Sequence, residues 1–281
     1  MSMFKRKTKN AFLDKVVVIT GVGSGIGQAL ARVFADEGAT IVGTDKNPKG
    51  LEVTRRLLAG GAHLFLEQDV ADRQSFIDLA ATVKKTFGGA DVIINNAGVA
   101  LSQTVDKLKI EDFEWLMGIN FWGVVYGTQA FLPDMLSRRS GTIVNISSLF
   151  GLIGVPTQSA YNASKFAVRG FTESLRAELS GTGVRAICVH PGGIKTSIAA
   201  NARFYVGVDG ENDAQRAAQE FERIARTSPA EAAHTILEAV RHGDQRVLIG
   251  KDAKVLDWIQ RVAPVGYSGL LTKALSLSGK S

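Results

Sequence analysis

Three side chains between Ser148 and Lys165 could move a proton to or from an oxygen atom. Tyr161 and Lys165 stand four positions apart in a stretch of helix-forming composition, so both should project from one face of a helix. A lysine ammonium beside a phenol stabilises the phenolate, and we expect it to lower the tyrosine pKa from its ordinary value of about 10. Ser148 ends an apolar stretch typical of a strand and could present its hydroxyl to the same oxygen. The pattern indicates acid–base chemistry, although a Tyr–Lys pair alone also fits two neighbours on an exposed helix.

A glycine-rich turn lies far upstream of these residues. The β-branched run Lys15–Thr20 is typical of a strand buried on both faces, and it leads into the turn Gly21-Val22-Gly23-Ser24-Gly25-Ile26-Gly27 and then a helical stretch. Glycines allow a backbone to approach a diphosphate, and the start of a helix offers free N–H groups and partial positive charge. Strand, glycine turn and helix together predict a dinucleotide site, although the glycine spacing differs from the commonest fingerprint.

An acidic residue follows the second predicted strand, at 40–44. Asp45 lies where a carboxylate can accept hydrogen bonds from the ribose 2′-hydroxyl of NAD and would repel the 2′-phosphate of NADP. Lys46 and Lys49 follow closely and could offset that repulsion. The sequence therefore favours NAD and leaves NADP open.

Predicted strands and helices alternate along the rest of the chain. Further strands are expected at 63–68, 91–94, 142–148, 184–190 and 246–250, with helices between them. This alternation predicts an α/β fold, a single-domain Rossmann-like, doubly wound parallel sheet of about seven strands with helices on both faces. We expect a basic tail at 1–13, a catalytic domain at 14–250 with a substrate lid at 197–227, and a helical extension at 251–281.

Charge and composition narrow the functional class. The net charge is +6, but the positive residues gather at the two ends, unlike the basic face of a nucleic-acid-binding protein. No apolar run reaches the roughly 20 residues that span a bilayer, and the basic N-terminal stretch lacks the apolar core of a signal peptide. The one cysteine, Cys188, lies in an apolar stretch and is predicted to be a buried thiol. We therefore expect a cytoplasmic protein without a nucleic-acid partner and without a metal site.

Together these motifs resemble the short-chain dehydrogenase/reductase superfamily in its single-domain form. The resemblance covers about residues 14 to 197 and thins beyond them. It rests on matches that follow in chain order: Thr20-Gly21 with Gly25-Ile26-Gly27, Asn95-Asn96-Ala97-Gly98, Asn120, Ser148 with Tyr161 and Lys165, and Pro191-Gly192 with Thr196. Many relatives end in a VDGG-like segment, whereas this chain has 246–253 and a longer tail, so the family's usual C-terminal oligomer contacts are not carried over.

The resemblance implies hydride transfer between a nicotinamide cofactor and a substrate carbonyl carbon. Tyr161 would give or take the hydroxyl proton, and Ser148 would orient the oxygen. Lys165 would lower the pKa of Tyr161 and bind the nicotinamide ribose, while Asn120 would position a water that joins Lys165 to solvent. The implied catalytic residues are Asn120, Ser148, Tyr161 and Lys165, of which Ser148 and Tyr161 contact substrate. The implied cofactor-binding residues are Gly21, Ser24, Gly25, Ile26, Gly27, Asp45, Asp69, Val70, Asn96, Ala97, Gly98, Tyr161, Lys165, Pro191, Gly192, Ile194 and Thr196.

The expected substrate is an apolar secondary alcohol or ketone, bulky ones included. Apolar residues lie in the predicted lid and before Tyr161: Ile198, Phe204, Tyr205, Val206 and Phe221, and Leu149, Phe150, Leu152, Ile153 and Val155. Arg203 and Lys195 stay open as contacts to an acidic substrate.

Two other functions are weighed against this one. The first is a membrane-associated relative acting on a lipid-like substrate, with the basic N-terminus and the apolar 258–275 tail as its contacts. The second is a cofactor-sensing protein without turnover, which the intact Ser–Tyr–Lys set disfavours. The resemblance also implies a homodimer or homotetramer, formed through the helices predicted within 109–136 and 160–179.

Overall fold

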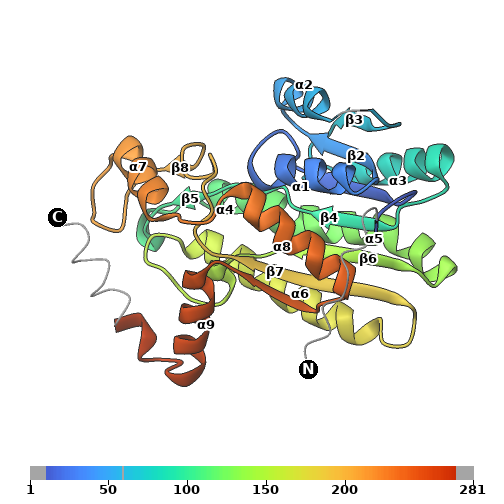
Figure 1. Cartoon of the computed structure of the whole chain (residues 1–281). Helices are drawn as coiled ribbons and strands as arrows, with labels where there is room; N and C mark the ends of the chain where they lie inside the picture. Colours follow the sequence, from blue (N-terminus) through green and yellow to red (C-terminus); the bar gives the residue numbers. More distant parts are fainter. Residues whose placement is uncertain (1–10, 59, 270–281) are drawn as a thin grey trace.

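Seven parallel strands form one sheet in the order β3–β2–β1–β4–β6–β7–β9 (Figure 1). The computed structural model describes residues 11–58 and 60–269. The strands are β1 Val16–Thr20, β2 Thr40–Asp45, β3 Leu64–Glu67, β4 Val92–Asn95, β6 Gly141–Ile146, β7 Val184–Pro191 and β9 Arg246–Ile249. Successive strands run outward from β1 to β3 and then from β4 in the other direction, so the predicted doubly wound sheet is confirmed.

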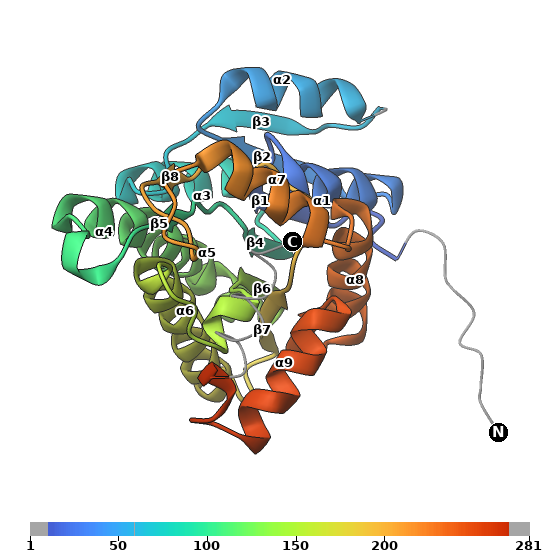
Figure 2. The same ribbon diagram turned by 90° about the vertical axis from the view of Figure 1, so that its left-hand side faces the viewer.

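Helices cover both faces of the sheet because each central strand is apolar on both faces. In β1, Val17 and Ile19 enter one core while Val16 and Val18 enter the other. The first core is closed by α1 Gly25–Asp36 and α8 Pro229–His242, and the second by α3 Arg73–Phe87, α5 Gly123–Arg138 and α6 Ser159–Glu178 (Figure 2). A further helix, α2 Pro48–Leu57, follows β2.

The segment predicted as one helix from 109 to 136 is divided in the structure. It contains α4 Ile110–Met117, a π-helical turn at Gly118–Trp122, and then α5. Such wide turns interrupt helices mostly at functional sites. Here the turn carries Asn120, a residue type that is unfavourable inside a helix.

The segment 197–227 covers the carboxyl ends of the strands, at the left of Figure 1. It contains β8 Arg203–Phe204, which pairs in parallel with β5 Leu101–Ser102, and the helix α7 Ala214–Ile224. After β9 the chain forms α9 Lys251–Val262. The predicted basic tail up to residue 10 and the end of the extension from 270 lie outside the described residues.

Candidate active site

The glycine turn between β1 and α1 forms a cradle that side chains would fill. Gly21 and Gly25 have φ angles of +72° and +56°, in the region that favours glycine. A Cβ atom at Gly27 would overlap the carbonyl of Gly21. The side chain of Ser24, which precedes the helix, caps no backbone N–H. An open backbone at a helix start fits a diphosphate, so the predicted cofactor residues suit the group that the sequence implied.

The segment after β4 is attached to this cradle. The hydroxyl of Thr20 accepts hydrogen bonds from the backbone N–H groups of Asn96 (3.0 Å) and Ala97 (3.1 Å). The Asn96 amide donates in return to the carbonyls of Thr20 (2.9 Å) and Gly21 (3.3 Å). The predicted residues 96–98 therefore border the glycine turn. Thr20, which the sequence analysis gave only as part of the glycine motif, links this segment to the turn.

The carboxylate of Asp45 is held at the end of β2 by two backbone donors. Its oxygens accept hydrogen bonds from the N–H groups of Gly23 and Asn47, each at 2.8 Å. The Lys46 ammonium turns away and lies 2.5 Å from Asp69. Burial raises the pKa of Asp69, but the hydrogen bonds from Lys46 and the Ala71 N–H outweigh it and leave that pKa lowered. Lys46 thus neutralises Asp69 rather than Asp45.

Ser148, Tyr161 and Lys165 are brought together beyond the end of β6. Tyr161 and Lys165 project from α6, and the Lys165 Nζ lies 5.6 Å from the centre of the Tyr161 ring. That ammonium is almost fully buried and donates to the carbonyl of Ile146 at 3.0 Å. The Ser148 hydroxyl accepts the Phe150 N–H at 3.1 Å. The predicted constellation is therefore a single cluster at the carboxyl edge of the sheet.

The expected lowering of the Tyr161 pKa is not what the structure gives. Burial raises the pKa of Tyr161 to about 12, and a hydrogen bond with Ser148 opposes this only in part. Burial also lowers the pKa of Lys165 to about 8. The ammonium faces the ring and the Ile146 carbonyl, so desolvation outweighs its effect on the phenol.

Asn120 is a fully buried, satisfied amide. Its oxygen accepts the Val99 N–H at 2.8 Å, and its nitrogen donates to the Val99 carbonyl (3.0 Å) and the Ser164 hydroxyl (3.2 Å). A Cβ added at Gly98 would lie 3.3 Å from the Asn120 Oδ1 and 3.4 Å from the Lys165 Nζ. The side chain thus fixes the loop beside Lys165, and the water relay stays a prediction.

The turn after β7 is clamped by a residue that the sequence did not single out. Asp252, in the first turn of α9, accepts the Gly193 N–H at 2.6 Å, and it fills the space that a Cβ at Gly192 would need. Beyond this turn Ile194 is buried and the Thr196 methyl group lies 3.1 Å from a Cβ placed at Gly25. The predicted Pro191–Thr196 segment therefore reaches the glycine cradle.

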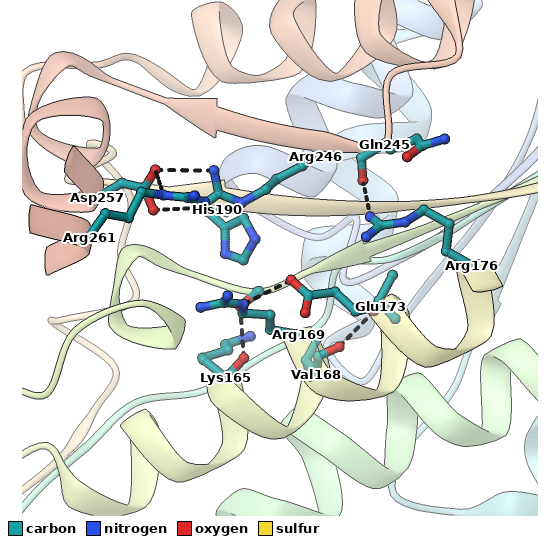
Figure 3. Close-up of polar contacts among 12 residues, drawn as sticks. Lys165, Val168, Arg169, Glu173, Arg176, His190, Gln245, Arg246, Asp257 and Arg261 are labelled. Atoms are coloured by element: carbon teal, nitrogen blue, oxygen red, sulfur yellow. Dashed lines mark hydrogen bonds and ion pairs between the residues drawn. The ribbon is translucent and has the colours of Figure 1, made fainter. Parts of the chain in front are cut away.

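A buried histidine was also missed. The His190 ring, at the end of β7, contacts the Ser148 carbonyl and lies beside Arg246, whose guanidinium binds Asp257 of α9 (Figure 3). Its one usable signal in the sequence is a histidine that follows the apolar run Ala186–Val189. His190 thus contacts the backbone of Ser148, whereas Asp252 links α9 to the turn after β7.

The predicted apolar walls are only partly open. Leu149, Leu152 and Ile153 are buried in a small core with Ala253 of α9, whereas the Phe150 ring stands edge-on to Tyr161 with 5.9 Å between centroids. The position beside Tyr161 makes Phe150 the member of this group nearest to the chemistry.

The lid is fastened to α4 by polar contacts. Arg203 lies 2.6 Å from Asp112 and stacks 3.7 Å from the centre of the Trp115 ring, and the Tyr205 hydroxyl donates to Asp112 at 2.9 Å. Arg203 and Tyr205 therefore attach the segment predicted as the lid to α4, and their role toward a substrate stays a prediction. A cavity of about 980 Å³ lies between the lid helix α7, α1 and α8 and reaches Gly25 and Lys195.

Within the described ranges 11–58 and 60–269, no group of three or more His, Cys, Asp or Glu is arranged to hold a metal ion. Across the same residues, every helix is too short or too polar to cross a bilayer.

Known proteins resemble this chain in sequence and in fold. The family model for short chain dehydrogenases matches residues 15–204. The SadH protein of Mycobacterium tuberculosis (strain H37Rv), named as an oxidoreductase, is 46% identical over 272 residues, which is 95% of this chain and 97% of that protein. A short-chain dehydrogenase/reductase from Burkholderia phymatum, solved in complex with NAD, has a TM-score of 0.81 at 30% identity and covers 89% of this chain and 94% of its own. The closed form of serine dehydrogenase complexed with NADP+ has a TM-score of 0.75 at 26% identity, over 83% of this chain and 94% of its own.

Proposed function

Because the chain belongs to the short-chain dehydrogenase family, we propose that it transfers a hydride between a nicotinamide cofactor and a secondary alcohol or ketone. The observation that carries this proposal is the cluster of Ser148, Tyr161 and Lys165 beside the loop from 96 to 99. When bound, the nicotinamide ring supplies or accepts the hydride. The chain's own residues then have to orient the substrate oxygen and exchange its proton.

Tyr161 is the proton donor and acceptor in this proposal. With its pKa raised to about 12 it holds its proton at neutral pH, which suits protonation of the oxygen formed when a ketone is reduced. Ser148 shares a hydrogen bond with Tyr161, so both hydroxyls can meet one oxygen. Lys165 would bind the ribose hydroxyls, and Asn120 would keep the loop at Val99 fixed beside it.

NAD is the cofactor we propose, with NADP as the alternative. The Asp45 carboxylate would lie near the ribose; its partners in the structure are uncharged backbone N–H groups, and Lys46 is bound to Asp69. A 2′-phosphate would be repelled by that carboxylate, and Lys46, one of the two lysines that could offset the repulsion, is paired with Asp69. Gly21–Gly27 would hold the diphosphate, and Ile194 and Thr196 would hold the nicotinamide carboxamide.

An apolar substrate is supported by Phe150 beside Tyr161 and by the ion pair that occupies Arg203. Among the two cations left open by the sequence, Arg203 already has a carboxylate partner inside the protein. The test measures turnover of a panel of secondary alcohols of increasing size with NAD or NADP. Turnover is monitored by nicotinamide absorbance. Activity on apolar alcohols supports the proposal, and activity confined to acidic substrates contradicts its substrate class.

The partner proposed for the outer faces of α5 and α6 is a second copy of this chain. Phe121, Trp122, Tyr126 and Phe171 form ring contacts there, and Trp122 and Phe166 are exposed. Aromatic side chains that are half in solvent are typical of interface cores. Light scattering on the purified protein tests this assembly.

A further inference from the structure

The helix α9 carries an apolar stripe on its outer side. The exposed fractions are 54% for Val255, 65% for Trp258 and 66% for Val262, and Val265 just beyond the helix is 83% exposed. Their spacing of three and four residues aligns them along one face. Figure 2 shows α9 at the margin of the molecule, with no other described element outside it.

The opposite side of α9 is fixed to the body of the protein. Ala253 is fully buried beside Leu149 and Leu152. Asp257 accepts hydrogen bonds from both terminal nitrogens of Arg246 on β9, at 2.5 and 3.1 Å (Figure 3). Turning the helix to bury Trp258 would separate this nearly buried pair and leave a charge without its partner. The stripe therefore faces outward because of how α9 is anchored.

The charges on α9 are sorted in the same way. Asp257 is buried and binds Arg246, and the Asp252 carboxylate, although exposed, is bound to the Gly193 N–H. Lys251 and Lys254 are exposed beside the stripe. The outward side of this helix is thus apolar with basic neighbours, which complements an anionic surface that has an apolar interior.

We propose that α9 docks this protein on the surface of anionic lipid bilayers, with Trp258 and its valine neighbours in the interfacial layer. Tryptophan favours that layer, and a helix with an apolar face and flanking lysines binds there in the plane of the membrane. A second copy of the chain fits less well, because a stable interface buries about 800 Å² on each partner and the stripe is one narrow helix ridge.

The position of the stripe connects docking to the site. The inner side of α9 packs against the loop that follows Ser148, and one helix diameter is about 10 Å. Docking would therefore place that loop about one helix diameter from the bilayer surface, close to any substrate dissolved in the membrane. This last step rests on the proposed function, whereas the docking itself does not.

Vesicle co-sedimentation of the full-length protein tests the docking. We expect binding to vesicles of phosphatidylcholine mixed with phosphatidylglycerol and little binding to phosphatidylcholine alone. The variant Val255→Ser/Trp258→Ser/Val262→Ser should bind at least about tenfold more weakly, since it loses the buried apolar area. Lys251→Gln/Lys254→Gln should weaken binding about fivefold per lysine at low salt.

A matched control uses exposed apolar residues elsewhere. Val105 and Ile110 are 73% and 66% exposed, so Val105→Ser/Ile110→Ser removes exposed apolar area from another surface and should leave binding unchanged. Turnover of a water-soluble alcohol should survive in the triple variant, so loss of docking and failure of the proposed reaction are separate results.

Three results would overturn the docking. The first is equal binding of the wild-type protein and the triple variant. The second is a lower molecular mass of the triple variant in light scattering, which would make the stripe a contact between copies. The third concerns the fluorescence of Trp258, measured as the difference between the wild type and Trp258→Phe. If acrylamide cannot quench this fluorescence in the absence of vesicles, other residues of the chain cover Trp258.

Discussion

The Nδ1 atom of His190 lies 3.2 Å from the backbone carbonyl oxygen of Ser148. A carbonyl only accepts hydrogen bonds, so this nitrogen carries a proton, and burial, which lowers the pKa of His190 to about 4, favours the neutral ring at neutral pH. His190 is fully buried, and the contact joins the end of β7 to the residue whose hydroxyl faces Tyr161. We infer that His190 positions Ser148 without itself touching the reacting atoms.

Replacing His190 separates this role from simple packing. His190→Leu leaves the Ser148 carbonyl without its donor, and we expect the free energy of unfolding to fall by about 1–3 kcal/mol together with a lower kcat. His190→Asn places an amide donor near the same point and should recover most of both. Urea unfolding and steady-state turnover measure the two effects. Equal losses in the two variants would mean that the hydrogen bond has no positioning role.

The same ring makes stability depend on pH. Burial lowers the pKa of His190 to about 4 from 6.5, and the charges of Arg246 and Arg169 act in the same direction, while the Ser148 carbonyl and Asp257 oppose it. Between these two pH values the unfolded chain binds a proton that the folded chain does not. The free energy of unfolding should therefore fall as the pH drops from about 6.5 to about 4, by up to roughly 3 kcal/mol.

Denaturant curves of wild type and His190→Asn across this range isolate the histidine from the carboxylates, which titrate in both proteins. The difference between the two proteins should shrink or reverse toward pH 4. A difference that is constant with pH would show that His190 does not titrate on unfolding in this way.

Tyr161→Phe removes the proposed proton donor and little else. We expect turnover to fall by about 100-fold or more while cofactor binding, measured by calorimetry, survives. Tyr126→Phe on α5 is the matched control and should keep full activity. Near-normal turnover in Tyr161→Phe would rule out the assigned proton transfer.

Local sequence signals were sufficient to predict the sheet and the grouping of Ser148, Tyr161 and Lys165 at its edge. The β-branched run before Gly21 is a local pattern typical of a buried strand. The four-residue step from Tyr161 to Lys165 is the local spacing that places two side chains on one face of a helix. The residues that sequence reasoning missed or misjudged depend on contacts between distant segments. Asp252 is 59 positions from Gly193, and Arg203 is 91 positions from its partner Asp112.

Two further differences between prediction and structure concern Asn120 and Tyr161. Asn120, in the π-helical turn, makes buried hydrogen bonds to Val99 and Ser164 that the helical pattern of the sequence does not reveal. The pKa of Tyr161 depends on how much protein surrounds its hydroxyl. The sequence shows that Lys165 lies nearby, but it does not show this desolvation.

Cofactor choice should depend on the charge of Asp45. Asp45→Asn keeps the size of the side chain and removes its charge, so kcat/KM for NADP relative to NAD should rise about tenfold, equivalent to about 1.4 kcal/mol. Lys46→Gln is the informative control, because Lys46 pairs with Asp69 and its loss should leave that ratio nearly unchanged. A strong loss of NADP activity in Lys46→Gln would mean that the lysine leaves Asp69 to bind the 2′-phosphate.

The clamp from Asp252 to Gly193 should matter for cofactor affinity. Its carboxylate is the acceptor for a backbone N–H of the turn proposed to hold the nicotinamide, and Gly250, with a φ of +95°, turns the chain so that Asp252 reaches it. We expect Asp252→Ala to weaken cofactor binding about tenfold, as the loss of a hydrogen bond to a charged group does. Asp252→Asn retains an acceptor oxygen and should recover most of the affinity, whereas Lys251→Gln, one residue earlier, should change nothing. Calorimetric titration of NAD gives these affinities. If Asp252→Ala binds NAD as tightly as the wild type, the turn is held by its other contacts, such as the hydrogen bond from the Gly192 N–H to the Ile249 carbonyl.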